Sequence, residues 1–167
     1  MKKPVEDALK VLEEAKCLEQ EGQAFYGKAA ERITSKKGRE MFLSLVKDEV
    51  MHERLIQRQI DALASAGNWV ELSQAQGAKC DLSQPIFPKG REGLAKAVKA
   101  DATDTEALIV ALEMENNSFE LYKRAAETAQ DPAARQMYEF LASQERVHFD
   151  LLMANYESMV QLGGWAD

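Results

Sequence analysis

Small and apolar side chains recur three and four positions apart along four long stretches of the chain. This spacing places them on one stripe of an α-helix, the stripe that faces the core of a helical bundle. The first stretch carries the pattern at Ala8, Leu12, Ala15, Gly22, Tyr26, Ala29 and Ile33. The four stretches predict helices near residues 4–33, 36–66, 103–130 and 132–162.

Capping signals and loop lengths indicate how these helices are connected. The signals for helix starts are Ser35, the pair Thr103 and Glu106, and Asp131 before Pro132. The signals for helix ends are Gly67 and the pair Gly163 and Gly164. The loops at 34–35 and 131 are short, and short loops join helices that lie antiparallel to each other. Residues 67–102 form a longer connection, which can run the length of a bundle and include a short helix near 91–100. The sequence predicts an all-α, ferritin-like antiparallel four-helix bundle with one long crossover between helices 2 and 3, in a single domain over residues 1–167.

The two predicted hairpins, about 4–66 and 103–162, are copies of one unit. Residues 15–56 align with residues 111–152 at a constant shift of 96 positions and without a gap. The residues of the first copy that recur are Ala15, Glu19, Tyr26, Ala29, Ala30, Glu31, Arg39, Met41, Leu45, Glu49, His52 and Leu55. A repeated helical hairpin is the simplest interpretation.

Glutamate and histidine interrupt the apolar stripes at equivalent places in both copies. These residues are Glu19, Glu49, His52, Glu115, Glu145 and His148. Each histidine follows a glutamate by three positions, so carboxylate and imidazole project from the same face of one helix. One glutamate from each of two helices plus a Glu-x-x-His from each of the other two is the ligand pattern of di-iron and di-manganese carboxylate bundles. Two divalent cations would neutralise four buried carboxylates that are otherwise costly, and oxygen and imidazole ligands suit iron or manganese, with zinc as an alternative.

One Glu-x-x-His motif alone is weak evidence, because a solvated glutamate beside a buried core histidine explains most single copies. In this chain the only two histidines both belong to such a motif, and both lie at the repeat shift. The pairing favours a metal site. The remaining acidic residues near these helices' midpoints lie off the stripes and are interpreted as a solvated face: Asp48, Glu53, Glu113 and Glu120.

Tyr26 and Tyr122 lie two helical turns beyond Glu19 and Glu115 on the same stripes. A buried tyrosine hydroxyl needs a hydrogen-bond partner, so we expect these two to bond ligand carboxylates, with plain core packing as the alternative.

Charge and composition exclude several classes of function. A formal net charge of −7 without a basic run argues against binding to nucleic acid. No apolar run reaches the length of a membrane span, and the N-terminus turns acidic where a signal peptide would be apolar. We therefore expect no membrane partner and a cytoplasmic location. Cys17 and Cys80 match no paired metal-binding spacing and are interpreted as free thiols.

With these residues in view, the sequence resembles the rubrerythrin branch of the ferritin-like di-iron carboxylate superfamily over nearly its whole length. The resemblance implies two iron ions per chain and a homodimer. It implies that Glu49 and Glu145 bridge the metals and that the terminal ligands are Glu19 with His52 and Glu115 with His148. The chain departs from rubrerythrins at Ser118, where they carry a further glutamate, and it lacks their rubredoxin-type paired Cys-x-x-Cys motifs. Turnover would then require an external electron donor.

Three functions fit these observations. The first is a di-iron oxidoreductase that reduces peroxide or dioxygen, or oxidises ferrous iron, at a site of four glutamates and two histidines. The second is an iron-binding or storage protein without dedicated turnover, which a large assembly with an iron core would reveal. The third is a structural role, in which the metal only holds the bundle together. Persistent zinc occupancy and the absence of a redox response would indicate this role.

Overall fold

The computed structural model describes residues 3–75 and 102–166 of the chain, and it confirms the all-α four-helix bundle. The long helices are α1 (Lys3–Arg32), α2 (Lys36–Ala66), α4 (Ala102–Thr128) and α5 (Pro132–Leu162). Each begins and ends within two residues of the predicted bounds. A short helix, α3 (Leu72–Ala75), was not predicted, whereas the helix expected near 91–100 lies outside the described residues.

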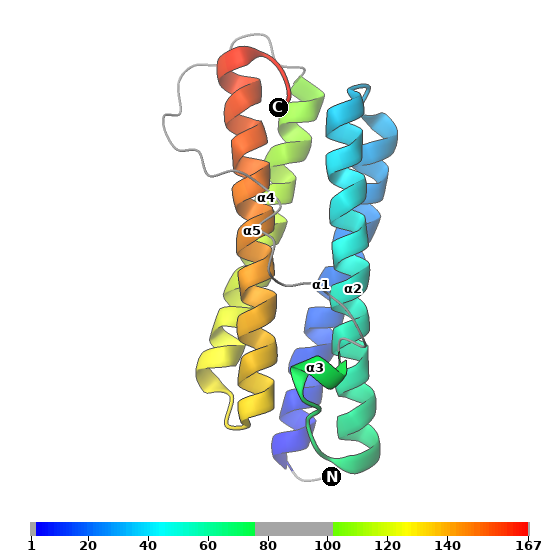
Figure 1. Ribbon diagram of the computed structural model, residues 1–167, viewed down its shortest axis with the longest axis vertical. Coiled ribbons are helices and arrows are strands. Elements are labelled where there is room, and N and C mark those ends of the chain that lie inside the picture. Colours follow the sequence, from blue (N-terminus) through cyan, green and yellow to red (C-terminus); the bar gives the residue numbers. More distant parts are fainter. Residues whose placement is uncertain (1–2, 76–101, 167) are drawn as a thin grey trace.

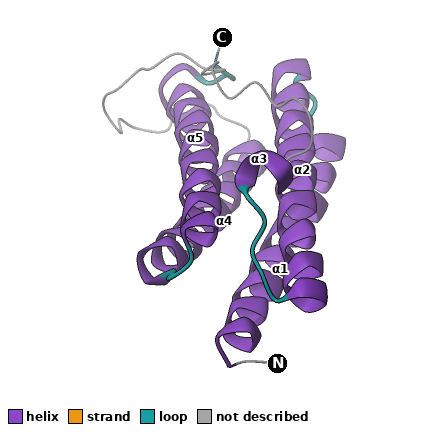
Figure 2. Cartoon of the chain, turned by 60° about the horizontal axis from the view of Figure 1, so that its bottom comes forward, coloured by secondary structure: helices purple, strands orange, loops and turns teal. Residues whose placement is uncertain are grey.

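The four long helices form two antiparallel hairpins that lie side by side, as Figures 1 and 2 show. Helix α1 packs along α2, α4 packs along α5, and α1 also contacts α4. In Figure 1, α2 ends at the bottom of the bundle and α4 starts at the top. The connection between them therefore joins opposite ends of the bundle, which is the predicted crossover.

Most of the predicted caps are present. The Ser35 hydroxyl accepts from the backbone N–H of Gly38, and the Asp131 carboxylate accepts from the first amides of α5. Gly67 and Gly163 end α2 and α5 with left-handed φ values of 71° and 72°, a conformation that glycine adopts without strain. The side chain of Thr103 lies outside the described residues.

Two apolar clusters fill the ends of the bundle. One, which we call the α3-end cluster, lies in the half that holds α3 and includes Leu12, Leu55, Ile56, Leu63, Tyr122, Met137 and Leu141. The other, the far-end cluster, includes Tyr26, Ile33, Phe42, Leu45, Leu108, Leu152 and Met159. Along each long helix the predicted glutamates and histidines fall between the two clusters. None of the described helices combines the length and the apolar character that a membrane span requires.

Candidate metal centre

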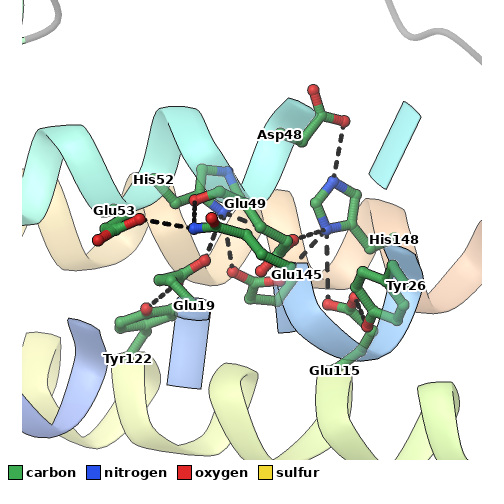
Figure 3. A network of polar contacts seen from close by, with 11 residues as sticks. Glu19, Tyr26, Asp48, Glu49, His52, Glu53, Glu115, Tyr122, Glu145 and His148 are labelled. Atoms are coloured by element: carbon green, nitrogen blue, oxygen red, sulfur yellow. Dashed lines mark hydrogen bonds and ion pairs between the residues drawn. The ribbon is translucent and has the colours of Figure 1, made fainter. Parts of the chain in front are cut away.

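All six residues singled out in the sequence meet in one buried layer between the two apolar clusters. Their exposed fractions are between 0 and 4%. The members of this layer are Glu19 from α1, Glu49 and His52 from α2, Glu115 from α4, and Glu145 and His148 from α5. Figure 3 shows the side chains converging from all four long helices. We call this group the polar layer.

The polar layer divides into two sets of four potential ligands. One set is Glu19, Glu49, His52 and Glu145, and the other is Glu49, Glu115, Glu145 and His148. Within each set, one ligand atom per residue lies within 4.8 Å of the others. Glu49 and Glu145 belong to both sets, which is the arrangement that two bridging carboxylates require. The ligand roles stay a prediction, and the geometry is compatible with them.

Both imidazole rings turn Nδ1 toward the carboxylates. Nδ1 of His52 lies 3.2 Å from Glu145 and 3.3 Å from Glu19. Nδ1 of His148 lies 3.2 Å from Glu49, 3.3 Å from Glu145 and 3.5 Å from Glu115. The rings stack with their centroids 5.5 Å apart.

The polar atoms that face the middle of this layer fit a bound cation. Seven buried side-chain atoms there have no hydrogen-bond partner within the described part of the chain: Glu19 Oε2, Glu49 Oε1, both carboxylate oxygens of Glu145, both ring nitrogens of His52, and Nδ1 of His148. A buried polar atom without a partner is rare because its desolvation is not compensated. Six of the seven are atoms through which these residues would bind metal, so the chain's own residues fit a metal centre.

Without metal, burial and the nearby negative charge raise the pKa values of two carboxylates in the layer, Glu49 and Glu115. Burial raises the pKa of Glu49 well above its usual value, and the charge of Glu145 raises it further. Burial raises the pKa of Glu115 to about 8, again with the help of Glu145. Burial acts in the same direction on Glu145, but its interactions with Glu115 and with the charge of His52 lower its pKa below the usual range. Glu145 thus favours the ionised form, whereas Glu49 and Glu115 favour the protonated form.

The histidines respond to the same charges. Burial alone would lower the pKa of His52, but the negative charges of Glu19 and Glu145 raise it well above its usual value. The pKa of His148 is likewise raised against the effect of burial, first by its hydrogen bond to Asp48. Two divalent cations would displace these protons and take over the neutralisation of the layer.

Two tyrosines bond Glu19 and Glu115 crosswise between the hairpins. The Tyr26 hydroxyl of α1 donates to Glu115 of α4, and the Tyr122 hydroxyl of α4 donates to Glu19 of α1. Figure 3 shows both pairs at the side of the layer nearest α1 and α4. The expected hydrogen bonds to the predicted ligand carboxylates are therefore present. Burial is the main cause that raises the pKa of each hydroxyl well above its usual value, and the charge of the adjacent carboxylate adds to it.

The off-stripe acids Asp48 and Glu53 are partly exposed and belong to neither ligand set, but each also makes a contact that the sequence did not indicate. Nε2 of His148 donates to the Asp48 carboxylate at 3.2 Å, from α5 to α2. Glu53 accepts hydrogen bonds of 2.7 Å from both Gln20 and Gln23 of α1. The side chains that remain exposed, as expected, are Glu113 and Glu120. Cys17 is an exposed free thiol, and Cys80 lies outside the described residues.

A cavity of about 60 Å³ adjoins the polar layer between α1 and α4. Its inner wall is formed by Glu49, Glu115 and Tyr26. Its remaining lining consists of three pairs of residues related by the 96-position repeat: Leu18 and Met114, Glu21 and Asn117, Gly22 and Ser118. Because a single water needs about 10–15 Å³ of such space, the cavity has room for a few waters or one small molecule.

Gly22 and Ser118 keep this cavity open. A Cβ atom at Gly22 would lie 3.1 Å from Glu49 Oε2, so even an alanine would press on that carboxylate. Ser118, at the equivalent position of α4, is 9% exposed and carries a short side chain. Glu21 and Asn117 are exposed and line the outer part of the cavity. The sequence did not lead us to predict this cavity, although it shows small residues, Gly22 and Ser118, at both repeat-related positions.

Fold, residue pattern and layer geometry together define a helical bundle with a buried, carboxylate-rich cluster that could hold metal. The family model described as Rubrerythrin matches residues 10–156, and the chain belongs to the rubrerythrin family. This family implies binding of a di-iron centre, with which the buried glutamates and histidines are compatible. No curated protein and no solved structure matches the chain.

Proposed function

We propose that the chain binds two iron ions in the polar layer and acts as an oxidoreductase that reduces peroxide or dioxygen, or oxidises ferrous iron, with electrons from an external donor. The observation that carries the proposal is the division of the layer into two ligand sets that share Glu49 and Glu145. Four carboxylate and two imidazole ligands suit iron or manganese better than a thiolate-preferring metal. Membership in the rubrerythrin family favours iron.

The metal pair would supply two electrons at one place, which is the number that reduces one peroxide to water. The chain's residues supply the surroundings. Glu49 and Glu145 would hold both ions, and the crosswise tyrosines fix the orientation of Glu19 and Glu115. The apolar clusters on either side exclude bulk water from the layer.

The cavity beside Gly22 and Ser118 suits a small oxidant and excludes a large organic substrate. It reaches the carboxylates of Glu49 and Glu115 and is about 60 Å³ in volume. Tyr26, whose hydroxyl donates a hydrogen bond to Glu115, lines the inner wall of the cavity. A protonated side chain therefore lies beside any small molecule that enters the cavity. Ser118 cannot replace a carboxylate as a ligand, since its side chain is shorter and a neutral hydroxyl is a weaker donor to the metal. We therefore expect slower peroxide turnover than in rubrerythrins that carry glutamate at this position.

Anaerobic oxidation of the ferrous protein tests the proposal. Wild-type, Ser118→Glu and Ser118→Ala proteins at equal iron loading are mixed with peroxide or with dioxygen, and oxidation is followed by absorbance. The wild type should be oxidised by at least one of the two. Ser118→Glu should turn peroxide over faster with a supplied reductant, whereas Ser118→Ala, which adds no carboxylate, should behave as the wild type. A ferrous wild type that reacts with neither oxidant would contradict the oxidoreductase proposal and leave an iron-binding role.

A further inference from the structure

The two histidines of the polar layer are supported differently, although they occupy equivalent positions of the repeat. Each turns Nδ1 toward the carboxylates, so metal bound at Nδ1 places the remaining ring proton on Nε2. A metal-bound histidine binds best when that N–H donates to an acceptor, which fixes the ring and increases its basicity. The surroundings of the two Nε2 atoms therefore decide how well each histidine can hold a metal.

For His148 that acceptor is present. Its Nε2 lies 3.2 Å from the Asp48 carboxylate, which α2 provides across the bundle. The Asp48 side chain is 39% exposed, so water solvates the rest of the carboxylate while one oxygen holds the imidazole (Figure 3).

For His52 the described part of the chain offers no such acceptor. Its Nε2 is fully buried and has no hydrogen-bond partner among the residues that the structure describes. The repeat shift of 96 places Gln144 where Asp48 stands in the first copy. Gln144 is half-buried on α5, and its amide is uncharged. The two halves of the repeat thus share the histidine but differ at the position that supplies the carboxylate to His148.

We infer that the two metal positions are unequal: the position at His148 binds its ion more tightly, because Asp48 orients this histidine, and the position at His52 fills last and empties first. Asp48 is in this view a positioning residue. The difference in affinity should be on the order of 10–100-fold, the usual effect of such an outer hydrogen bond. The inference rests on the metal centre of the proposed function and is independent of its redox chemistry.

Zinc tests the inference without any electron transfer. Metal-free full-length protein is titrated with Zn²⁺ against a competing chelator, and crystals grown with one equivalent of zinc locate the first ion by its anomalous scattering. The expected result is two binding steps and an anomalous peak at His148 Nδ1. Asp48→Asn replaces the carboxylate beside His148 with an uncharged amide, so the two affinities should converge through weakening of the first step. Gln144→Asp should strengthen the second step by about tenfold.

Glu113→Gln is the matched control, because it removes one negative charge from an exposed position of α4 outside the polar layer. It should leave the ratio of the two affinities unchanged. The inference would be overturned if the wild type bound zinc in two equal steps or bound its first ion at His52. It would also be overturned if Asp48→Asn kept the wild-type ratio of affinities, or if Gln144→Asp left the second step unchanged. The redox proposal would survive any of these. Absence of zinc from the polar layer would also overturn the inference, whereas the redox proposal concerns iron and is decided by the oxidation of the ferrous protein.

Discussion

Leu45 and Glu49 lie one turn apart on α2 and are almost equally buried, at 1% and 4% exposure. Leu45 packs within the far-end cluster of apolar side chains. Glu49 faces other carboxylates and leaves Oε1 without a hydrogen-bond partner in the described chain. The same contrast separates Leu141 from Glu145 on α5.

The apolar packing that stabilises the fold and the candidate metal site thus occupy different levels of one bundle. Burial of the apolar clusters stabilises the fold, at about 25 cal/mol for each Å² of apolar surface removed from water. Burial of the polar layer costs free energy, because ionisable groups are desolvated without sufficient partners. A bound metal pair would change the sign of that contribution. The predictions below test whether the two levels can be separated.

The largest effect is expected from loss of a shared carboxylate. Glu145→Ala and Glu49→Ala should each weaken both metal positions, because each residue belongs to both ligand sets. Iron bound per chain after anaerobic loading should fall well below that of the wild type, while the helical circular dichroism spectrum is retained. Full occupancy in both variants would contradict the ligand assignment.

Metal removal should destabilise the bundle in a pH-dependent way. In metal-free protein the raised pKa values of Glu49, of Glu115 (about 8) and of His52 mean that the folded state binds more protons than the unfolded state. Stability should therefore fall as pH rises from about 4.5 to about 8. Metal keeps the carboxylates ionised and neutralised, so it removes this dependence.

The measurement is the melting temperature with and without metal at pH 5 and at pH 8. The gap between the two forms should be wider at pH 8. A gap that is absent at pH 8, or that is wider at pH 5, would contradict a buried carboxylate site.

Truncation of a side chain within an apolar cluster should lower stability but leave metal binding intact, the opposite of what is expected for the glutamate variants. Leu141 is fully buried, so Leu141→Ala should lower the free energy of unfolding by about 2–5 kcal/mol through lost burial and a residual cavity. The protein should still bind as much metal as the wild type at saturation. Urea denaturation and metal analysis of the same preparation check both parts. Loss of metal with little loss of stability would show that the two levels are not separable.

A smaller effect is expected where the two levels meet. Tyr122 belongs to the α3-end cluster through its ring and to the polar layer through its hydroxyl, which donates to Glu19. Tyr122→Phe keeps the ring and should lower metal affinity by about tenfold. Competition titration with a chelator measures it, and Tyr138→Phe is the control, since Tyr138 is buried in the same cluster and stacks against Tyr122. Equal effects of the two substitutions would remove the special role of the hydroxyl.

Much of the fold and of the site could be predicted from the sequence, because periodicity reports which stripe of a helix is buried. Glu19 and Glu115 stood out as charged residues in otherwise apolar stripes, and the structure places them in the polar layer. The hydrogen bonds of Tyr26 and Tyr122 followed from the same register. The crosswise pairing did not, because it depends on the packing of α1 against α4.

Asp48 could not be assigned by the same reasoning. It precedes Glu49 by one position and so lies off the buried stripe, and its contact with His148 depends on how α2 and α5 approach each other. Helix α3 was missed for a related reason. It is four residues long and follows a segment held by long-range contacts: Gln59 bonds both backbone groups of Val70, and Trp69 packs edge-on against Tyr138.

The most direct test of the whole account is the number of ferrous ions that the wild-type chain binds under anaerobic conditions. Metal-free protein is titrated with Fe²⁺ at pH 7, and bound iron is separated from free iron and measured at each addition. The account predicts saturation at two ions per chain, because two ligand sets share Glu49 and Glu145. Saturation at one ion, or no saturable binding, would contradict it.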